Sequence, residues 1–372
     1  MKFTINKNDI LDILSKVQGI CGRKSNLAIT SNILINANES GISLAVTDLE
    51  TGFEGRYPAV VESHGLIAIN ARKFFEIVRD FPSSDILINE VENRWIEIGS
   101  QGIEYHIVGM NPDDFPEIPK ISDVEFFEVD SIDIKKAIER MLVIGASSDE
   151  KRAHILGVHF ERIEGEDAKL IRMASTDGRR LSKVDYLCED DMKLPMGNNV
   201  IVPKKGFAEI NKFLAPDGTV QIGIKDNHFI LQKENETLII GLLEGEFPEY
   251  ADILVKDEER SIELDRHLFM MMLKRMSILS SDDYRSVVFN FSDGRLLVTA
   301  TNPDIGESKE DMAIAFAKDP VEVAFNPKYF IDTLNSIEDE KVFLNITDGE
   351  TPCLVEGAID KSFLSVIMPM KI

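Results

Sequence analysis

The sequence lacks the short motifs that mark most enzyme active sites. It has no P-loop, no GxSxG and no GxGxxG, and its six histidines form no HExxH or HxH pattern. Chemistry that depends on a cradled phosphate, an activated serine or a zinc ion normally leaves one of these patterns. The segment STDGRRLSKVD brings Asp, Arg and Ser together, but an Asp-Gly pair is far more often a turn than a catalytic device. We therefore expect no catalytic residues, no metal site and no cofactor.

Cysteine and long apolar runs are also scarce. The three cysteines (Cys21, Cys188 and Cys353) are scattered, odd in number and without metal-ligand spacing, which is typical of thiols in a reducing cytoplasm. No apolar run approaches the ~20 residues of a membrane span, and the N-terminus lacks the charged-then-apolar layout of a signal peptide. We expect a cytoplasmic protein that does not bind membranes.

One sequence pattern occurs three times in the chain, in NARKFFEIVRDF, VPKKGFAEINKFL and NPKYFIDTLNSI. Each segment follows a strand-like run and continues with Ala or Pro, then basic residues, then apolar residues at helical spacing. Ala71, Pro203 and Pro327 occupy matching places. A second marker, Thr-Asp or Thr-Asn after an apolar strand, recurs at Thr47, Thr176 and Thr301, which are 129 and 125 residues apart. Two markers with a common period indicate a triplicated unit, each copy as large as a small domain.

Each copy is predicted to be an α+β domain. An amphipathic helical pattern opens each one, at residues 7–20, 131–145 and 265–277. The remaining segments, such as GISLAVTD and TVQIGIK, alternate and end at Gly, Asp or Asn, which favours short antiparallel strands. Two helices and about eight strands are expected per copy. We place the domains at residues 1–122, 128–252 and 253–372.

The charge is unevenly distributed. The chain carries −24 in total, but six predicted helical segments (7–20, 71–81, 131–145, 203–214, 265–277 and 327–336) together carry +6, which leaves −30 for the rest. Helix surfaces are often rich in Lys and Arg, so this count alone has an ordinary explanation. A second interpretation is a basic helical face that binds a polyanion. Since the Debye length is only ~8 Å at physiological salt, a distant acidic face would not prevent this.

Several of these segments resemble one bacterial family, the DNA polymerase III beta sliding clamps. The ending SVIMPMKI resembles that family's terminal methionine-proline-methionine ending, and STDGRRL resembles its TDG loop. NPDDFPEIP and EGEFPEY resemble its domain-closing segments, and KRAHILGVHF resembles its R-x-x-L-x-G strand. The resemblance extends over the whole chain.

The resemblance implies a fold and a function. The fold would be three DNA-clamp domains per chain, with helices on an inner face and antiparallel sheets outside, and two chains would close head to tail into a six-domain ring around duplex DNA. The homodimer would tether the replicative polymerase without catalysis. Its partners would be double-stranded DNA of any sequence, the DNA polymerase III catalytic subunit, the clamp loader, and other polymerases and repair proteins that carry clamp-binding peptides.

The resemblance also assigns residues to three surfaces. A partner-peptide cleft would consist of Ile155, Thr176, Gly178, Arg179, Arg180, Leu181, Pro248, Val366, Met368, Pro369 and Met370. The DNA-binding residues would be Arg23, Lys24, Arg72, Lys73, Lys136, Arg152, Lys204 and Lys205. The dimer interface would pair Tyr105 and Ile107 of the first copy with Ile278 and Leu279 of the third.

Three points remain open at this stage. Arg179 stands where the family commonly has His, and Asp252 stands where some members have a basic residue, so the preferred partner sequence is not predicted. The C-terminal segment could instead be a core strand with a frayed end. The alternative function is a non-enzymatic interaction scaffold that does not encircle DNA and whose helices contact acidic proteins.

Overall fold

The computed structural model describes residues 1–21, 27–100, 102–145, 152–164, 169–187, 200–279 and 286–371. By its internal contacts the chain forms two compact units. The first unit comprises Met1–Lys135, Asp191–Met196 and Lys205–Leu242, and the second comprises Lys136–Asp190, Gly197–Lys204 and Leu243–Ile372.

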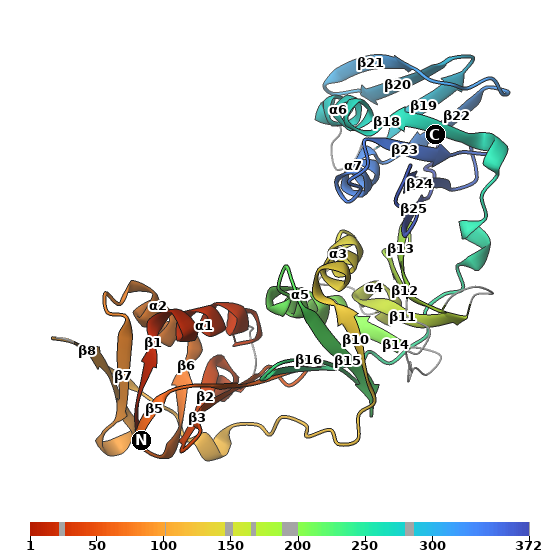
Figure 1. Cartoon of the computed structure of the whole chain (residues 1–372). Coiled ribbons are helices and arrows are strands. Elements are labelled where there is room, and N and C mark those ends of the chain that lie inside the picture. The colour runs from red at the N-terminus through yellow and green to blue at the C-terminus, as the bar shows by residue number, and fades with distance from the viewer. Residues whose placement is uncertain are drawn as a thin grey trace. The chain divides into compact units, whose positions relative to one another are not determined.

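The first unit contains two antiparallel sheets and the helices that pack on them (Figure 1). Its helices are α1 (Lys7–Cys21), α2 (Ala71–Asp80) and nearly all of α5 (Lys204–Phe213). Its strands are β1 (Lys2–Asn6), β2 (Asn32–Asn38), β3 (Gly41–Thr47), β4 (Thr51–Tyr57), β5 (Val60–Ser63), β6 (Gly65–Asn70), β7 (Asp85–Glu90), β8 (Trp95–Ser100), β9 (Ile103–Val108), β10 (Phe126–Asp130), β15 (Thr219–Lys225), β16 (His228–Lys233) and β17 (Glu236–Gly241). One sheet has the order β5-β1-β7-β8-β9, and the other has the order β10-β15-β16-β17-β4-β3-β2-β6.

The helices of the first unit follow from local sequence. The sequence predicts an apolar stripe of Ile10, Leu11, Leu14 and Val17 in α1; Ile10, Leu14 and Val17 are completely buried, and Leu11 is half-buried. Helix α2 begins where the Asn70 side chain accepts a hydrogen bond from the Lys73 backbone N–H at 3.0 Å, which satisfies a donor that the first helical turn cannot pair. The two helices pack against each other.

The second unit repeats this plan. Its helices are most of α3 (Ser131–Leu142), the short α4 (Ala153–Leu156), α6 (Arg266–Met276) and α7 (Pro327–Asn335). Its strands are β11 (Gly157–Glu164), β12 (Lys169–Thr176), β13 (Arg180–Leu187), β14 (Val200–Pro203), β18 (Ser261–Asp265), β19 (Val287–Ser292), β20 (Arg295–Asn302), β21 (Gly306–Ala313), β22 (Val321–Phe325), β23 (Lys341–Asn345), β24 (Cys353–Gly357) and β25 (Phe363–Ile367). The sheet orders are β14-β11-β12-β13-β25-β24-β23-β18 and β21-β20-β19-β22.

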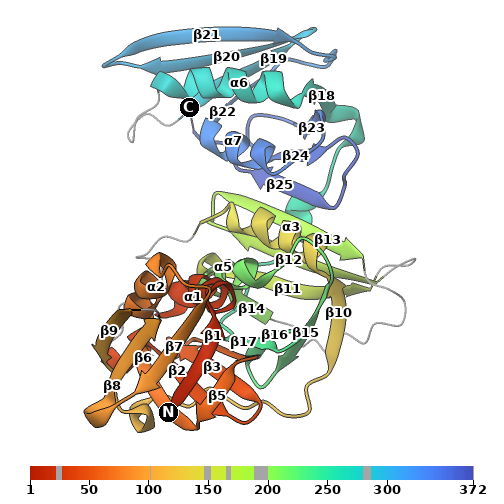
Figure 2. The same ribbon diagram turned by 60° about the vertical axis from the view of Figure 1, so that its left-hand side comes forward.

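An aromatic core holds the last third of the chain together. Phe269 of α6, Phe330 of α7 and Phe289 of β19 are fully buried, with ring centroids 5.2–6.1 Å apart, the spacing at which edge-to-face pairs are favourable. Figures 1 and 2 show α6 and α7 side by side, with β19–β21 along one side of the pair.

The element order confirms the predicted triplication and the α+β class. A strand and helix, then three strands, then a strand and helix, then three strands occur in each third of the chain, with β5 and α4 as additions. The sheets, however, are shared between consecutive copies. Strand β17 of the second copy pairs with β4 of the first, and β25 of the third pairs with β13 of the second. The pairing satisfies backbone groups on strands that would otherwise be sheet edges.

Candidate functional site

The predicted TDG loop is a tight turn between β12 and β13. The Thr176 hydroxyl accepts a hydrogen bond from the Gly178 N–H at 3.0 Å and donates one to the Arg180 carbonyl at 2.8 Å. The Asp177 carboxylate accepts bonds from the backbone N–H groups of Arg179 and Arg180, both at 3.0 Å. Gly178 has φ +83°, a left-handed conformation that glycine adopts without steric cost. The segment is therefore a turn, as the Asp-Gly pair indicates.

Arg180 directs its charge into the protein. The side chain is only 8% exposed, and its guanidinium binds Asp177 at 3.1 Å and Asp332 of α7 at 2.8 Å. It also stacks over the Tyr329 ring, 4.4 Å from the centroid, and donates to the Val143 carbonyl at 3.4 Å. Arg180 thus ties the turn to helix α7, and its charge does not face solvent.

An apolar cluster lies beside this turn. Leu181 of β13 is directly opposite Val366 of β25, so the strand pairing brings together two predicted cleft residues that are far apart in sequence. The buried members of the cluster are Ala174, Leu181, Tyr250, Leu354, Leu364 and Val366, with Phe247, Ile253 and Leu254 packed against it. Pro248 is exposed between Phe247 and Tyr250. Ile155 is buried in α4, outside this cluster.

The C-terminal segment beyond β25 is anchored. The Met368 N–H donates to the Arg179 carbonyl at 3.0 Å, and the Met370 N–H donates to the Ala324 carbonyl at 2.8 Å. Met368 and Met370 are nevertheless 38% and 36% exposed. Two held backbone positions that present flexible, polarizable side chains suit a surface that accepts different apolar peptides.

The wall of the cluster is supported by a stacked histidine. The His159 ring lies parallel to the Phe247 ring with centroids 4.9 Å apart. Burial lowers the pKa of His159, and the nearby Glu161 only partly offsets this effect. Glu161 accepts a hydrogen bond from the Tyr250 hydroxyl, and burial together with this carboxylate raises the pKa of Tyr250. Neutral His159 therefore packs as an aromatic ring at physiological pH.

The predicted DNA-binding cations lie in several environments. Arg23 and Lys24 lie outside the described residues. Arg72 and Lys73 are exposed on α2, and both pair with Glu76, at 3.1 Å and 2.8 Å. Lys136 of α3 lies 3.4 Å from Glu338. Arg152 and Lys205 are also exposed. Ion pairs at exposed sites are weak, so a phosphate can compete for these cations.

Lys204 corrects the sequence prediction. Its side chain is only 4% exposed, and its ammonium donates to the Thr176 carbonyl at 3.1 Å, so it is not available to a phosphate. The sequence pattern matches Pro203 with Ala71, but the structure shifts this match by one residue. Gly157 pairs with Pro203 as Asn32 pairs with Asn70, and the helices begin at the next residue. Lys204 therefore matches the buried Ala71, and the exposed Lys205 matches Arg72.

The residues predicted for the dimer interface are accessible within their own units. Strand β9 is the edge of its five-stranded sheet, where Tyr105 is 43% exposed and Ile107 is half-buried. Ile278, in the short turn after α6, is 75% exposed, and Leu279 is half-buried. An edge strand with exposed apolar side chains is a surface that normally requires a partner or protection.

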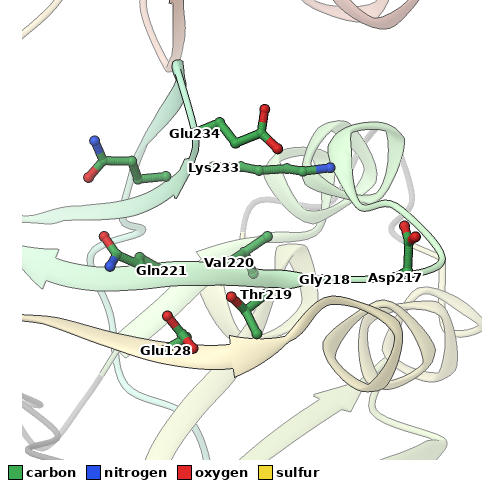
Figure 3. A pocket seen from close by; sticks show the side chains of 9 residues that line it. Glu128, Asp217, Gly218, Thr219, Val220, Gln221, Lys233 and Glu234 are labelled. Atoms are coloured by element: carbon green, nitrogen blue, oxygen red, sulfur yellow. The ribbon is translucent and has the colours of Figure 1, made fainter.

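Two further surface features were not predicted. Glu97, Glu104 and His106 on β8 and β9 have ligand atoms within 4.8 Å of one another. The strand register assembles this group, so no linear metal motif reveals it. The second feature is a hollow of about 590 Å³ over β10, β15 and β16 (Figure 3). The carboxylates of Glu128, Asp217 and Glu234 line it, which makes it unsuitable for an apolar peptide. Within the described residues, the helices are too short or too polar to cross a bilayer.

Three consecutive segments of the chain match one family. Residues 1–119 match the DNA polymerase III beta subunit, N-terminal domain, residues 128–249 match its central domain, and residues 251–371 match its C-terminal domain. The chain belongs to the DNA polymerase III beta subunit family. The predicted membership of this family is thereby confirmed.

Curated relatives of this family and solved structures align with the full chain. The beta sliding clamp of Chlamydia pneumoniae is 27% identical over 372 residues, covering 100% of this chain and 99% of the relative. That of Escherichia coli strain K12 is 29% identical over 380 residues, covering 100% of both chains. The DNA polymerase sliding clamps of Pseudomonas aeruginosa and Caulobacter crescentus are 27% and 25% identical, with TM-scores of 0.90 and 0.92 and complete coverage of both chains.

For this beta-subunit family member, the sequence pointed to two members of the apolar cluster, Leu181 and Val366. The members that it did not indicate are Ala174, Phe247, Tyr250, Ile253, Leu254, Leu354 and Leu364. Phe247 and Tyr250 were detectable, because they belong to the recognised EGEFPEY segment. Leu354 and Leu364 had no local signal, since they reach the cluster only because β25 pairs with β13 and β24 pairs with β25.

Proposed function

We propose that this chain is a sliding clamp that encircles duplex DNA and tethers the replicative polymerase for processive synthesis. The observation that carries the proposal is the match to all three beta-subunit domains, in order, over 1–119, 128–249 and 251–371. Its role is architectural, without catalytic turnover, in the bacterial cytoplasm where the chromosome is replicated.

The proposed ring is a head-to-tail homodimer of six domains. The exposed edge strand β9 and the exposed Ile278 would form the two halves of each contact, and a pair of such contacts related by a two-fold axis closes on itself. The exposed cations of α2, α3 and α5 would face phosphates inside the ring. Phosphate contacts carry no sequence information, which a sliding protein requires.

The proposed partner site is the apolar cluster beside the TDG turn, together with the exposed Met368 and Met370 that follow β25. Its partners would be the DNA polymerase III catalytic subunit, the clamp loader, and other polymerases and repair proteins with clamp-binding peptides. A partner Leu or Phe that buries ~150 Å² gains roughly 4 kcal/mol before the entropy of ordering the peptide is subtracted. Since a dissociation constant of 1 μM corresponds to about 8 kcal/mol, a peptide needs more than two such residues to reach it, and single peptides should bind no more tightly than about micromolar and exchange readily.

Topology tests the proposal directly. The chain is loaded on nicked circular DNA with a clamp loader and ATP, and the DNA–protein complex is isolated by gel filtration. Cutting the circle once with a restriction enzyme should release the protein, while the uncut circle should retain it. Release at equal rates from both DNA forms would favour the alternative function, a scaffold that does not encircle DNA.

A further inference from the structure

The turn beside the cleft has a counterpart in the first copy. In the turn between β3 and β4, Leu49 N–H donates to the Thr47 hydroxyl at 3.0 Å, and the N–H groups of Glu50 and Thr51 donate to Asp48 at 3.1 Å and 2.7 Å. These three bonds match the three backbone N–H bonds of residues 176–180. The Gly241 N–H also donates to the Glu50 carbonyl at 2.9 Å, as Met368 does to Arg179. The turn therefore forms without assistance from a buried cation.

The two turns differ at the left-handed position. Leu49 has φ +79° and Gly178 has φ +83°. The glycine leaves the cleft turn without a side chain at the place where a partner would approach, but it also permits many more backbone conformations than leucine. Contacts from residues outside the turn should therefore help to hold the backbone of residues 176–181 in one conformation.

Lys204 supplies such a contact. The matching residues in the other copies, Ala71 and Pro327, are buried at the starts of α2 and α7 and carry no charge. Only in the copy that bears the cleft does a cation occupy this place. Its ammonium donates to the Thr176 carbonyl at 3.1 Å, and Thr176 is the residue whose hydroxyl holds both Gly178 and Arg180.

The position is unfavourable for a cation. Burial lowers the pKa of Lys204 to about 8, with Asp177 opposing the shift and Arg180 reinforcing it. The start of a helix also carries partial positive charge, which disfavours an ammonium there. Burying the Lys204 ammonium is energetically unfavourable, and this ammonium contacts the turn of the proposed binding site. We therefore expect it to have a role in that site.

We propose that Lys204 is a positioning residue of the partner-peptide cleft, which holds the Thr176–Leu181 turn in its binding conformation through the Thr176 carbonyl. The proposal rests on the proposed peptide-docking function. Lys204 does not touch the peptide. It acts from beneath the turn, while Arg180 restrains the same turn through Asp177 and Asp332.

The test measures the affinity of the full-length protein for a fluorescent peptide copied from the C-terminus of a polymerase III catalytic subunit. Lys204→Met keeps the length of the side chain and removes the charge, and it should weaken binding about fivefold or more. Lys309→Met, at a 60% exposed lysine of β21, is the matched control and should bind like wild type. Lys204→Arg keeps a charged donor and should restore most of the affinity.

The pH profile separates positioning from a general effect on the fold. The charged groups around the Lys204 ammonium are Asp177 and Arg180, with Asp332 paired to Arg180. As the pH rises through about 8, Lys204 loses its proton and its charge-assisted bond to Thr176. Wild-type affinity should then fall relative to that of Lys204→Arg, which stays charged.

Each outcome has a distinct meaning. If wild type does not bind the peptide, the docking function itself is wrong. If wild type binds and Lys204→Met binds equally well, or if the pH profiles of wild type and Lys204→Arg coincide, Lys204 is not a positioning residue. A folded Lys204→Met protein, verified by its melting temperature, with weakened binding supports the proposal.

Discussion

Arg180 and Lys204 are both buried cations that interact with Asp177, and their surroundings differ. Arg180 has two carboxylate partners, Asp177 and Asp332, whereas the described hydrogen bond of Lys204 goes to a neutral carbonyl. A buried charge with weak compensation destabilises the folded state, since desolvation of an ion costs several kcal/mol. Lys204 is therefore the residue at which stability and function should conflict.

The stability of the protein should depend on pH through Lys204. Its pKa is about 8 in the folded protein and 10.5 in its unperturbed state, so between these values the unfolded chain binds more protons and stability rises with pH. Lys204→Met removes this pH-dependent contribution to the free energy of unfolding. We expect the variant to be more stable than wild type near pH 7, by up to about 3 kcal/mol, and to lose that advantage by about pH 10.5. Melting temperatures of both proteins across this range measure it, and a constant difference would contradict the assignment.

The buried cysteines should be inert. Cys21 and Cys353 are 4% and 0% exposed, and burial raises the pKa of Cys21 to about 12 and also raises that of Cys353. Because the thiolate is the reactive form, we expect no alkylation of either residue in the native protein at pH 8 and complete alkylation in denaturant. Peptide mapping by mass spectrometry distinguishes the sites. Native labelling of Cys353 would show that its strand opens.

At the scale of elements, strand pairing between copies assembles the proposed cleft. Strand β25 of the third copy brings Val366 against Leu181 of β13, and the chain then continues across the turn as Met368 and Met370. The same pairing of β17 with β4 occurs in the first unit, but there the chain continues into Leu242 and Leu243 and not into exposed methionines. The same strand pairing can thus be followed by chain segments with different side chains on the surface.

Deleting residues 368–372 should remove partner binding and preserve the fold. Strand β25 ends at Ile367, so the sheet and the buried cluster remain, while the exposed Met368 and Met370 are lost. Peptide affinity should fall at least about tenfold, with a small change in melting temperature. The matched control is Ile359→Ala, an apolar truncation at an 85% exposed site of the same copy, which should leave affinity unchanged. Wild-type affinity in the truncated protein would mean that the tail is not part of the site.

At the scale of the whole molecule, the proposed ring depends on apolar edges. Ile278→Ala combined with Leu279→Ala should shift the protein from dimers toward monomers, because truncating two apolar contacts in each interface removes several kcal/mol. Sedimentation at nanomolar to micromolar concentrations measures the dissociation constant. Ile359→Ala again serves as the control, since it removes an equally exposed isoleucine. A double variant that remains dimeric at nanomolar concentration would assign these residues to their own domain only.

Phosphate binding and encirclement of DNA can be separated by measuring the protein on linear and on circular duplexes. Arg72→Gln with Lys73→Gln should weaken equilibrium binding to linear duplex and reduce its salt dependence, because fewer counterions are released. The lifetime on a closed circle should hardly change, since escape requires opening of a protein interface. Arg295→Gln with Lys309→Gln, on the exposed strands β20 and β21, is the charge-matched control. Equal loss on circles and linear DNA would mean that phosphate contacts alone hold the protein.

The sequence by itself determined the triplication, the α+β class, the helices and the TDG turn. These features depend on periodicity and on hydrogen bonds between near neighbours, such as the Asn70 cap of α2 and the Asp177 bonds of the turn. Such local interactions can be read from a short stretch of sequence. The family resemblance then added the methionine tail, Leu181 and Val366 to the predicted cleft residues.

Only the tertiary structure decided which charges face solvent and which residues complete the cleft. Lys204 and Lys205 are adjacent and chemically identical, yet one is buried under the turn and the other is exposed, because the strand register sets where helix α5 begins. Arg180 could have faced a partner, but Asp332, 152 positions later, captures its guanidinium. Leu354 and Leu364 reach the cluster through pairing between copies. Burial and long-range pairing depend on which distant segments pack together, and no local pattern contains that information.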